Sequence, residues 1–332
     1  MKYYVLQFKF LTPVHFGSAG NKKSGNLQAF NCCADTFFSA LINEAAAQDL
    51  ELCRKFIDAV QQDGLLFSDL LPYYSGSAEE LYVPVPMYRK EKINPLDLQL
   101  SFKELCLQYE ARRGHENMAY IRVSGIYNYL RPYSVDGGNE EHRDFGWSGV
   151  QRRMDFRNGG CAYYVSNYTF AGEAGLYCIV GLDDESLLEG LVKTVELLGL
   201  GGIGGRRSSG FGKFVLKTEP LLLEQKCGGD AGVLYNLLHS GQNCPQMALS
   251  VLCPQESQIG IVKKGAFNLL KRSGFVYNSN TKSFEKRSSV YMLKAGSCFP
   301  QRVNGRLLEF TAEEAEHTVY RYGKAIYMGL PV

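Results

Sequence analysis

A glycine-rich segment that carries two arginines and two serines is the strongest chemical signal in this sequence. Glycine adopts backbone conformations that other residues avoid, and successive backbone N–H groups can form a concavity that binds anions. Arginine and serine side chains add charge-assisted and hydroxyl hydrogen bonds to phosphate oxygens. The segment therefore predicts a loop that holds a phosphodiester backbone. The residues expected to contact it are Gly202, Gly204, Gly205, Arg206, Arg207, Ser208, Ser209, Gly210 and Lys213.

Two well-known nucleotide-binding loops do not fit this segment. A Walker A loop needs the pattern G-x-x-x-x-G-K-[ST] between a strand and the helix that it opens. Here the glycines follow a helical pattern, and no Gly-Lys-Ser or Gly-Lys-Thr is present in them. A dinucleotide-binding loop fails for the same topological reason. The remaining alternative is a flexible surface turn that binds nothing.

His15 and Asp35 have side chains that could do chemistry. His15 could act as a general base in RNA cleavage, but its place at the end of a predicted strand favours a hydrogen-bonding or RNA-contacting role. Asp35 precedes an apolar helical pattern, which favours an N-cap role over a cleavage role. We therefore expect no catalytic residue.

His317 follows an acidic run, so a metal site is conceivable there. A single histidine near exposed carboxylates more often interacts with the end of a helix, and we expect no metal and no cofactor. The acidic residues of the run are Glu313, Glu314 and Glu316.

Charge is unevenly distributed along the chain, although the net charge is only +2. Four basic residues and no acidic one lie between Glu196 and Glu219. Ten basic residues lie between Ser257 and Leu308, against Glu285 alone. Positive stretches of this kind favour an anionic partner, with a solvated surface as the alternative.

The ten cysteines show no C-x-x-C spacing, which argues against a zinc ribbon. No secretory signal opens the chain, and no apolar run approaches the roughly 20 residues of a membrane helix. We expect reduced thiols that fill a core, a cytoplasmic protein, and no membrane partner. With 45% hydrophobic residues the chain can bury a sizeable core.

The elements that must position the loop alternate between strand and helix patterns. Strands are predicted at 2–11, 162–170, 175–182 and 211–218, with shorter ones within 65–88. Helices are predicted after Asp35-Thr36, at about 51–62, and from Asp183-Asp184 to Gly199. This order favours an elaborated ferredoxin-like fold of the α+β class.

A second unit of similar architecture is predicted after the loop. It would contain a strand at 247–253, a basic hairpin-like region around 275–277 and 290–293, an acidic helix at 312–316, and a strand pair near Tyr320 and Ile326. The expected division is two ferredoxin-like (RRM-like) domains, 1–219 and 220–332. A long insertion at about 89–160 would carry a helix near 101–112 and an extended arm.

These motifs resemble the RAMP superfamily of CRISPR proteins, whose glycine-rich loop also follows a leucine-rich helix. The resemblance extends to one branch, the type III-A (Csm) effector subunit that caps the 5′ end of the guide RNA. The segments that carry it are Pro13-Val14-His15-Phe16-Gly17, Ala34–Leu41, Arg153–Arg157 with Cys161–Tyr164, Lys294-Ala295-Gly296-Ser297, and His317–Ala325.

The resemblance implies an RNA-binding subunit without catalytic activity. Such a subunit holds the repeat-derived 5′ handle of the guide RNA (crRNA), contacts target RNA only indirectly, and bridges two partners. The partners would be a large cyclase/polymerase-like subunit and a backbone RAMP subunit. The RNA-binding roles carry over to the glycine-rich loop, to His15, and to Arg153 and Arg157 of the arm.

Three alternatives stay open. A RAMP endoribonuclease that processes guide RNA would use His15 with Tyr or Lys residues, but in such enzymes the loop lies near the C-terminus, whereas about 120 residues follow it here. A protein–protein adaptor would not need the glycine-arginine loop. The arm could also be an ordinary β-hairpin whose Tyr163 and Tyr164 pack on the core.

Overall fold

The protein has a mixed α/β fold in which the strand pairings are antiparallel wherever the structure describes them. No helix among the described residues is both long and apolar enough to cross a membrane. The computed structural model describes residues 1–17, 30–88, 101–102, 118–130, 143–155, 160–241, 243–278, 283–286, 288–310 and 318–331.

One large sheet organises the N-terminal two thirds of the chain. Its strands lie in the order β10-β1-β8-β3-β4-β5, while β9 also pairs with β1 and β2 also pairs with β8. The strands are β1 (Lys2–Phe10), β2 (Leu65–Phe67), β3 (Leu71–Ser75), β4 (Glu79–Pro84), β5 (Tyr120–Arg122), β8 (Ala174–Leu182), β9 (Phe214–Leu216) and β10 (Leu221–Leu222).

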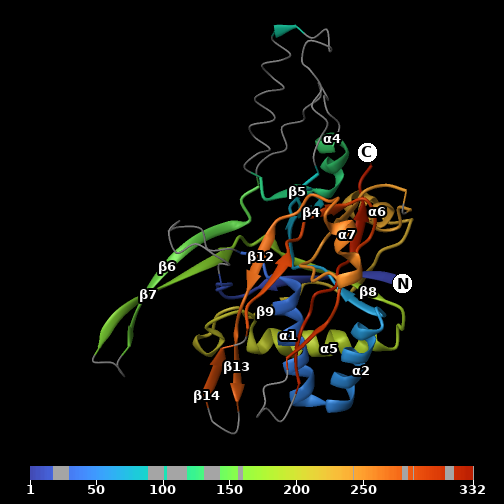
Figure 1. Ribbon diagram of the computed structural model, residues 1–332. Helices are drawn as coiled ribbons and strands as arrows, with labels where there is room; N and C mark the ends of the chain where they lie inside the picture. Colours follow the sequence, from blue (N-terminus) through green and yellow to red (C-terminus); the bar gives the residue numbers. More distant parts are fainter. Residues whose placement is uncertain are drawn as a thin grey trace.

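Three helices cover one face of this sheet, at the lower right in Figure 1. They are α1 (Ala34–Gln48), α2 (Leu50–Gln61) and α5 (Leu187–Gly201), and their positions confirm the predicted helices within two residues, apart from the start of α5, which was predicted at Asp183-Asp184. Apolar residues recur at helical spacing along α1, so Phe37, Phe38 and Leu41 are fully buried against the sheet.

Asp35 is not the N-cap of α1, contrary to the prediction. The N-cap is Cys33, whose side chain makes no capping hydrogen bond, and Asp35 lies inside the first turn. The capping role is filled from another element, because the Ala34 N–H donates to Asp69 Oδ1 at 2.8 Å. This leaves the Asp35 carboxylate available for a different contact, which is described below.

The second face of the sheet is buried by the C-terminal third of the chain. All nine residues of β8 are buried, and alternate residues such as Tyr177 and Ile179 face away from the helices. These side chains pack with Leu234, Met247 and Leu249 in one hydrophobic cluster. The face of the sheet that could have been open to a ligand is therefore closed over much of its area.

The C-terminal third consists of short elements. A three-stranded sheet has the order β16-β11-β19, and β12-β15, β13-β14 and β17-β18 form two-stranded ladders. The elements are α6 (Gly229–Leu238), β11 (Gln246–Ala248), α7 (Ile259–Val262), β12 (Leu269–Arg272), β13 (Phe275–Asn278), β14 (Ser283–Lys286), β15 (Val290–Leu293), β16 (Cys298–Phe299), β17 (Leu308–Phe310), β18 (Val319–Arg321) and β19 (Tyr327–Gly329).

Several sequence-based expectations for this region were wrong in detail. The strand expected at 247–253 is only Gln246–Ala248, because the following residues are buried outside a regular ladder. The strands near Tyr320 and Ile326 do not pair with each other, since β18 pairs with β17 and β19 pairs with β11. Helix α6 was not anticipated. The helix expected at 312–316, and most of that expected at 101–112, lie outside the described residues.

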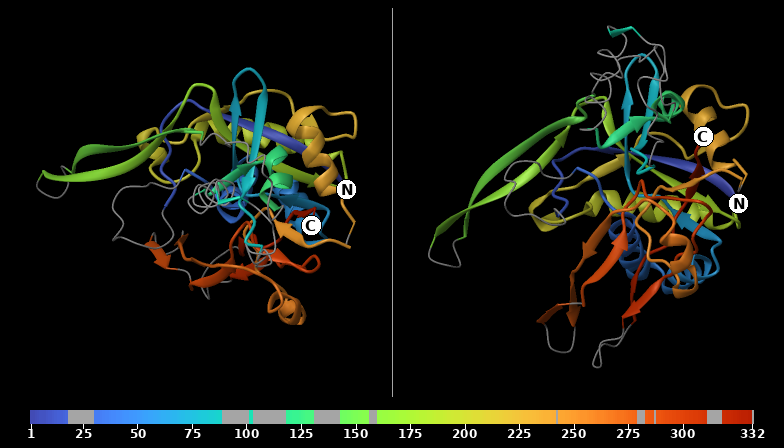
Figure 2. Two further views of the ribbon diagram at one scale, coloured as in Figure 1. Left: turned by 90° about the horizontal axis from the view of Figure 1, so that it is seen from above. Right: turned by 45° about the horizontal axis from the view of Figure 1, so that its top comes forward.

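The insertion contributes three described parts. Strand β5 joins the edge of the large sheet, and α4 (Ile126–Leu130) follows it. The arm is a long hairpin of β6 (Gly146–Asp155) and β7 (Cys161–Phe170), which projects from the body in each view of Figures 1 and 2.

The C-terminal signature that contains Tyr322 locks the two parts of the chain together. Its fully buried ring packs against Phe38 and Phe67, and its hydroxyl accepts a hydrogen bond from the Phe67 N–H at 2.8 Å. Lys324 donates to the Gln61 carbonyl at 2.8 Å. The division at 219–220 stays a prediction, because the hydrophobic clusters contain residues from both sides of it.

Replacing Tyr322 by Phe tests this lock. The variant Tyr322→Phe keeps the ring but leaves the buried Phe67 N–H without the hydroxyl oxygen that accepts its bond. We expect the free energy of unfolding to fall by about 1–3 kcal/mol, as for other buried groups that lose a partner. Urea denaturation measures the change. Tyr291→Phe on β15, where the side chain is 60% exposed, is the matched control, and equal stability of the two variants would contradict the lock.

Candidate nucleic-acid interface

The glycine-rich loop leaves α5 in conformations that only glycine adopts easily. Gly202 has φ +82° and caps the helix, with its N–H donating to the Leu198 carbonyl at 2.8 Å. Gly212 has φ +73°, and a Cβ there would lie 2.0 Å from the Ile203 carbonyl oxygen. These two glycines therefore let the two ends of the loop approach each other closely.

The loop docks on the segment that follows β1. The Gly205 N–H donates to the His15 carbonyl at 2.8 Å, and the Gly212 N–H donates to the Pro13 carbonyl at 2.9 Å. A Cβ on Gly205 would lie 2.8 Å from the His15 ring. These two backbone N–H groups already donate to carbonyls of the protein, so fewer remain for the anion-binding concavity expected from the glycines. Phosphate binding therefore depends more on side chains.

The polar side chains of the loop point outward between two buried anchors. Ile203 and Phe211 are buried at its two ends. The residues between them form a short 3-10 turn, Arg207–Ser209, preceded by Arg206 in a left-handed conformation with φ +62°. The exposed side chains are those of Arg206, Arg207, Ser208, Ser209 and Lys213, while Gly204 and Gly210 are partly exposed.

His15 joins the loop to the arm. Its ring Nδ1 lies 2.6 Å from the Ser166 carbonyl oxygen on β7, and the neighbouring Val14 exchanges two backbone hydrogen bonds with Tyr168. The ring is half-buried. Its position at the junction agrees with a strand-end hydrogen-bonding role.

The arm brings Arg153 to the loop. Arg153 lies opposite Tyr163 in the β6–β7 ladder. Its guanidinium carbon is 5.2 Å from the ring centre of Phe211, and that of Arg206 is 5.3 Å from the ring centre of Tyr163. Tyr164 is 70% exposed on the other face, so it does not pack on the core. Arg157 lies outside the described residues.

A cleft of about 1260 Å³ begins at this loop and separates the two parts of the chain. One wall comes from the N-terminal part, including Gly204, Gly205 and Arg207, and the other from the β12–β15 ladder and the residues after it. The basic side chains along the cleft are Arg143, Arg207, Lys271, Arg272, Lys294 and Arg321, and the acidic ones are Asp35, Asp69 and Asp144.

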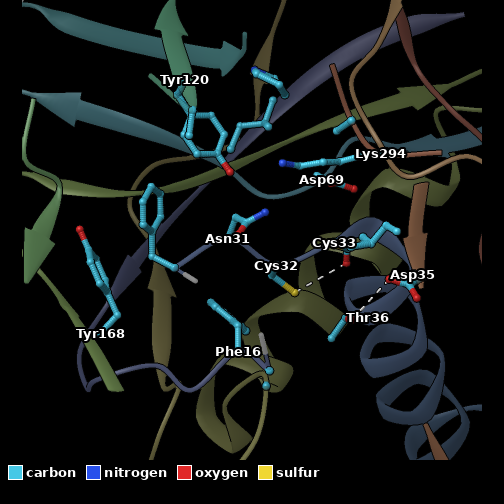
Figure 3. Close-up of a pocket in the computed structure, with 18 of the residues that line it drawn as sticks. Phe16, Asn31, Cys32, Cys33, Asp35, Thr36, Asp69, Tyr120, Tyr168 and Lys294 are labelled. Atoms are coloured by element: carbon cyan, nitrogen blue, oxygen red, sulfur yellow. Dashed lines mark hydrogen bonds between the residues drawn. The ribbon is translucent and has the colours of Figure 1, made fainter. Parts of the chain in front are cut away.

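Aromatic and polar side chains meet in the middle of the cleft. In Figure 3 Tyr120, Asn31 and Lys294 point toward the open space, with Tyr168 and Phe16 beside it. Burial raises the pKa of Tyr120 well above its usual value, so its hydroxyl stays a neutral hydrogen-bonding group. Sequence reasoning did not propose Lys271, Arg272 or Lys294 as RNA contacts, although all three lie in the basic run from 257 to 308.

Asp35 and Arg272 form a bidentate ion pair at the wall of the cleft. Arg272 donates to the two carboxylate oxygens at 2.8 and 2.7 Å, and also to Thr36 Oγ1 at 2.7 Å. The pair is largely buried, so removing one partner would leave a charge without compensation. Asp35 thus ties α1 to the C-terminal part of the chain.

Comparison with known proteins identifies relatives along the whole chain. Residues 242–330 match the family model described as the CRISPR Csm4 C-terminal domain. A protein of Streptococcus thermophilus named "CRISPR system Cms protein Csm4" is 26% identical, covering 100% of this chain and 99% of the relative. A Mycobacterium tuberculosis protein of the same name is 26% identical, covering 96% of this chain and 94% of that relative. The chain is thus similar to Csm4 proteins over its whole length, and residues 242–330 match their C-terminal domain.

Solved structures show the same fold for Csm4-containing assemblies. A chain from the "Csm3-Csm4 subcomplex in the type III-A CRISPR-Cas interference complex" aligns over 100% of both chains with a TM-score of 0.63 at 15% identity. A chain from a "Csm1-Csm4 cassette in complex with pppApA" aligns over 100% of this chain and 99% of that chain with a TM-score of 0.60 at 14% identity. Membership of the RAMP superfamily and of the type III-A class, inferred from the motifs, is thereby confirmed.

Asp69 connects three segments of this Csm4-like chain beneath the cleft. Its Oδ1 accepts from the Ala34 N–H at 2.8 Å and the Val251 N–H at 3.1 Å, and its own N–H donates to the Leu249 carbonyl at 3.0 Å. Burial raises the pKa of the Asp69 carboxyl to about 7, while the two backbone N–H groups oppose the shift. The protonated form is therefore favoured in the folded protein below neutral pH.

The raised pKa of Asp69 predicts a pH-dependent stability. An unfolded aspartate titrates near 3.9, so between about pH 4 and pH 7 the folded protein retains a proton that the unfolded chain has lost. This contribution to the free energy of unfolding is present below pH 4 and is lost as the pH rises toward 7. Asp69→Asn keeps an oxygen acceptor but does not titrate. Urea denaturation from pH 5 to 8 should show the wild type losing stability relative to the variant; parallel curves would contradict the assignment.

Proposed function

We propose that this Csm4-like chain is a non-catalytic RNA-binding subunit of a type III-A CRISPR effector complex. It holds the 5′ handle of the crRNA and bridges the large cyclase-like subunit to the backbone RAMP subunits. The observation that carries the proposal is the convergence of Arg153, Arg206 and Arg207 at the glycine-rich loop, of which Arg207 also lines a cleft with other basic and aromatic side chains.

The closed sheet face supports a path through the cleft. RRM-type domains bind RNA on the sheet face opposite their helices, but here the C-terminal part of the chain covers much of that face. The cleft offers what single-stranded RNA requires, since cationic groups pair with phosphates and aromatic rings stack on bases. Arg207, Lys271 and Lys294 supply exposed charge, and the partly exposed Phe30 and Tyr120 supply rings.

The proposed protein partners rest on the relatives. In the solved structures, Csm4 stands with Csm1 in a "Csm1-Csm4 cassette" and with Csm3 in a "Csm3-Csm4 subcomplex". We assign the corresponding partners to this chain as the large subunit and the first backbone subunit, with target RNA contacted through the crRNA. The projecting arm would lie along the crRNA beside the backbone subunit, and the complex would act in the cytoplasm.

The proposed architecture is a pair of ferredoxin-like domains, at 1–219 and 220–332. For the first, the support is the strand order β9-β1-β8-β3, with α1 and α2 between β1 and β2 and with α5 between β8 and β9. For the second, the support is the family resemblance of the Lys294–Ser297 and His317–Ala325 signatures.

The proposal includes the absence of catalysis. It is supported by the contacts and pKa values of the side chains that could otherwise act in catalysis. The Asp35 carboxylate is bound by Arg272 through both oxygens. The Nδ1 atom of His15 lies 2.6 Å from the Ser166 carbonyl oxygen. Burial raises the pKa of the Cys33 thiol well above its usual value, so it is not a ready nucleophile.

The decisive experiment on binding removes the two loop arginines. Arg206→Ala combined with Arg207→Ala should weaken crRNA binding at least roughly tenfold, because charge-assisted contacts to phosphates are lost. The slope of log affinity against log salt should flatten by about 0.7 per lost contact to single-stranded RNA. Filter binding at several salt concentrations measures both quantities.

A double variant on the helices is the matched control. Arg54→Ala with Lys193→Ala also removes two exposed positive charges, from α2 and α5. It should keep both the affinity and most of the slope. An unchanged affinity and slope in the loop variant would refute the assignment of the loop.

The non-catalytic part is tested by incubation with RNA. Purified protein should leave repeat RNA, target RNA and DNA intact, with or without divalent metal, over the time in which a processing enzyme cleaves its substrate. Denaturing gels read out the result. Reproducible cleavage that disappears in His15→Ala would instead favour a RAMP endoribonuclease that processes guide RNA.

A further inference from the structure

Four residues, two from the arm and two from the loop, are joined by a cycle of contacts and are here called the arginine–aromatic quartet. Arg153 and Tyr163 are direct cross-strand neighbours in the arm. Tyr163 lies under the Arg206 guanidinium at 5.3 Å, and Phe211 lies under the Arg153 guanidinium at 5.2 Å. A backbone hydrogen bond completes the cycle, because the Phe211 N–H donates to the Arg206 carbonyl at 3.4 Å. Each element thus supplies one arginine and one aromatic ring.

We propose that Tyr163 and Phe211 are positioning residues, which hold the guanidinium groups of Arg206 and Arg153 in place for the phosphates of single-stranded RNA. The inference rests on the proposed function and deepens it. It makes the part of the arm around Arg153 and Tyr163, near the turn of the hairpin, and the glycine-rich loop a single phosphate-binding unit rather than two separate contacts.

The two cation–π contacts support this role. A guanidinium over the face of an aromatic ring is held there by a cation–π contact, which does not use its N–H donors. Those donors can then form bidentate bonds to phosphate, although one N–H of Arg153 also donates to Gln151 Oε1 at 3.4 Å. A side chain that is already ordered also loses less conformational freedom when the ligand binds. Arg153 is held on a buried ring, since Phe211 is 3% exposed, whereas Arg206 is exposed and depends on Tyr163.

The backbone of Arg206 supports the same conclusion. Its φ of +62° lies in the left-handed region, which residues other than glycine seldom occupy. The residue stands between Gly205, which is docked on His15, and the turn Arg207–Ser209. This conformation accompanies the placement of the Arg206 side chain over the arm, whereas the next residue, Arg207, lines the cleft.

A double-mutant cycle separates positioning from direct contact. The probe is a fluorescein-labelled single-stranded RNA with the repeat-derived 5′ handle of the crRNA, titrated with the full-length chain in anisotropy measurements. Tyr163→Leu should weaken binding by about two- to fivefold, the size expected of one exposed cation–π contact. Tyr163→Phe keeps the ring and should bind like the wild type. In the Arg206→Ala background, Tyr163→Leu should have no further effect.

The control is another exposed tyrosine outside the quartet. Tyr127→Leu on α4 makes the same side-chain change away from the loop and should not alter affinity. Thermal melting of each variant, compared with the wild type, shows whether the fold is kept. Tyr163 is used rather than Phe211 because it is only partly buried, and its replacement leaves the core intact.

Each other outcome overturns a distinct claim. Equal losses from Tyr163→Leu in the wild-type and Arg206→Ala backgrounds would mean that Tyr163 contacts RNA directly, and the positioning role would be wrong. Loss of binding in the arginine variants with no effect of Tyr163→Leu would also remove the inference, while leaving the proposed function standing. No binding by the wild type, or no effect of Arg206→Ala with Arg207→Ala, would overturn the proposed function itself.

Discussion

Burial of the central sheet on both faces is the constraint on which the rest of the structure depends. Strand β8 is buried along its whole length, with helices on one side and the C-terminal third of the chain on the other. A sheet of this kind can present only its edges and the loops that join its strands. Candidate RNA contacts therefore lie in the loop after α5, in the segment after β1, and in the cleft between the two parts of the chain.

The cleft keeps its shape because buried polar contacts join its walls. Asp69 binds backbone groups of α1 and of the segment after β11, and Arg272 binds Asp35 at the start of α1. Tyr322 inserts its ring between Phe38 and Phe67. Each contact would leave a buried polar group unpaired if the two parts separated, which would cost free energy. The same contacts that hold the fold together thus set the width of the proposed RNA path.

The glycine-rich loop shows how a binding surface can depend on close backbone approach. Gly205 and Gly212 use their N–H groups to dock on the carbonyls of His15 and Pro13, where a side chain would collide. The glycines contribute by lacking a side chain, which lets the loop dock closely. The docked loop directs Arg206 toward the arm and Arg207 toward the cleft. Charge is thus concentrated on a chain whose net charge is only +2.

The sequence by itself determined β1, α1, α2, β7, β8, α5 and the position of the loop, because apolar periodicity over nine or more residues is a local signal. It also identified Arg153, Arg206 and His15 as candidates. Only the tertiary structure decided that Asp35 pairs with Arg272, that Asp69 takes over the cap of α1, and that two arginines and two aromatic rings interlock. The C-terminal strands were misjudged for the same reason. Ladders of two to four residues carry little local pattern, and their pairing is set by contacts between residues far apart in the chain, which periodicity does not encode.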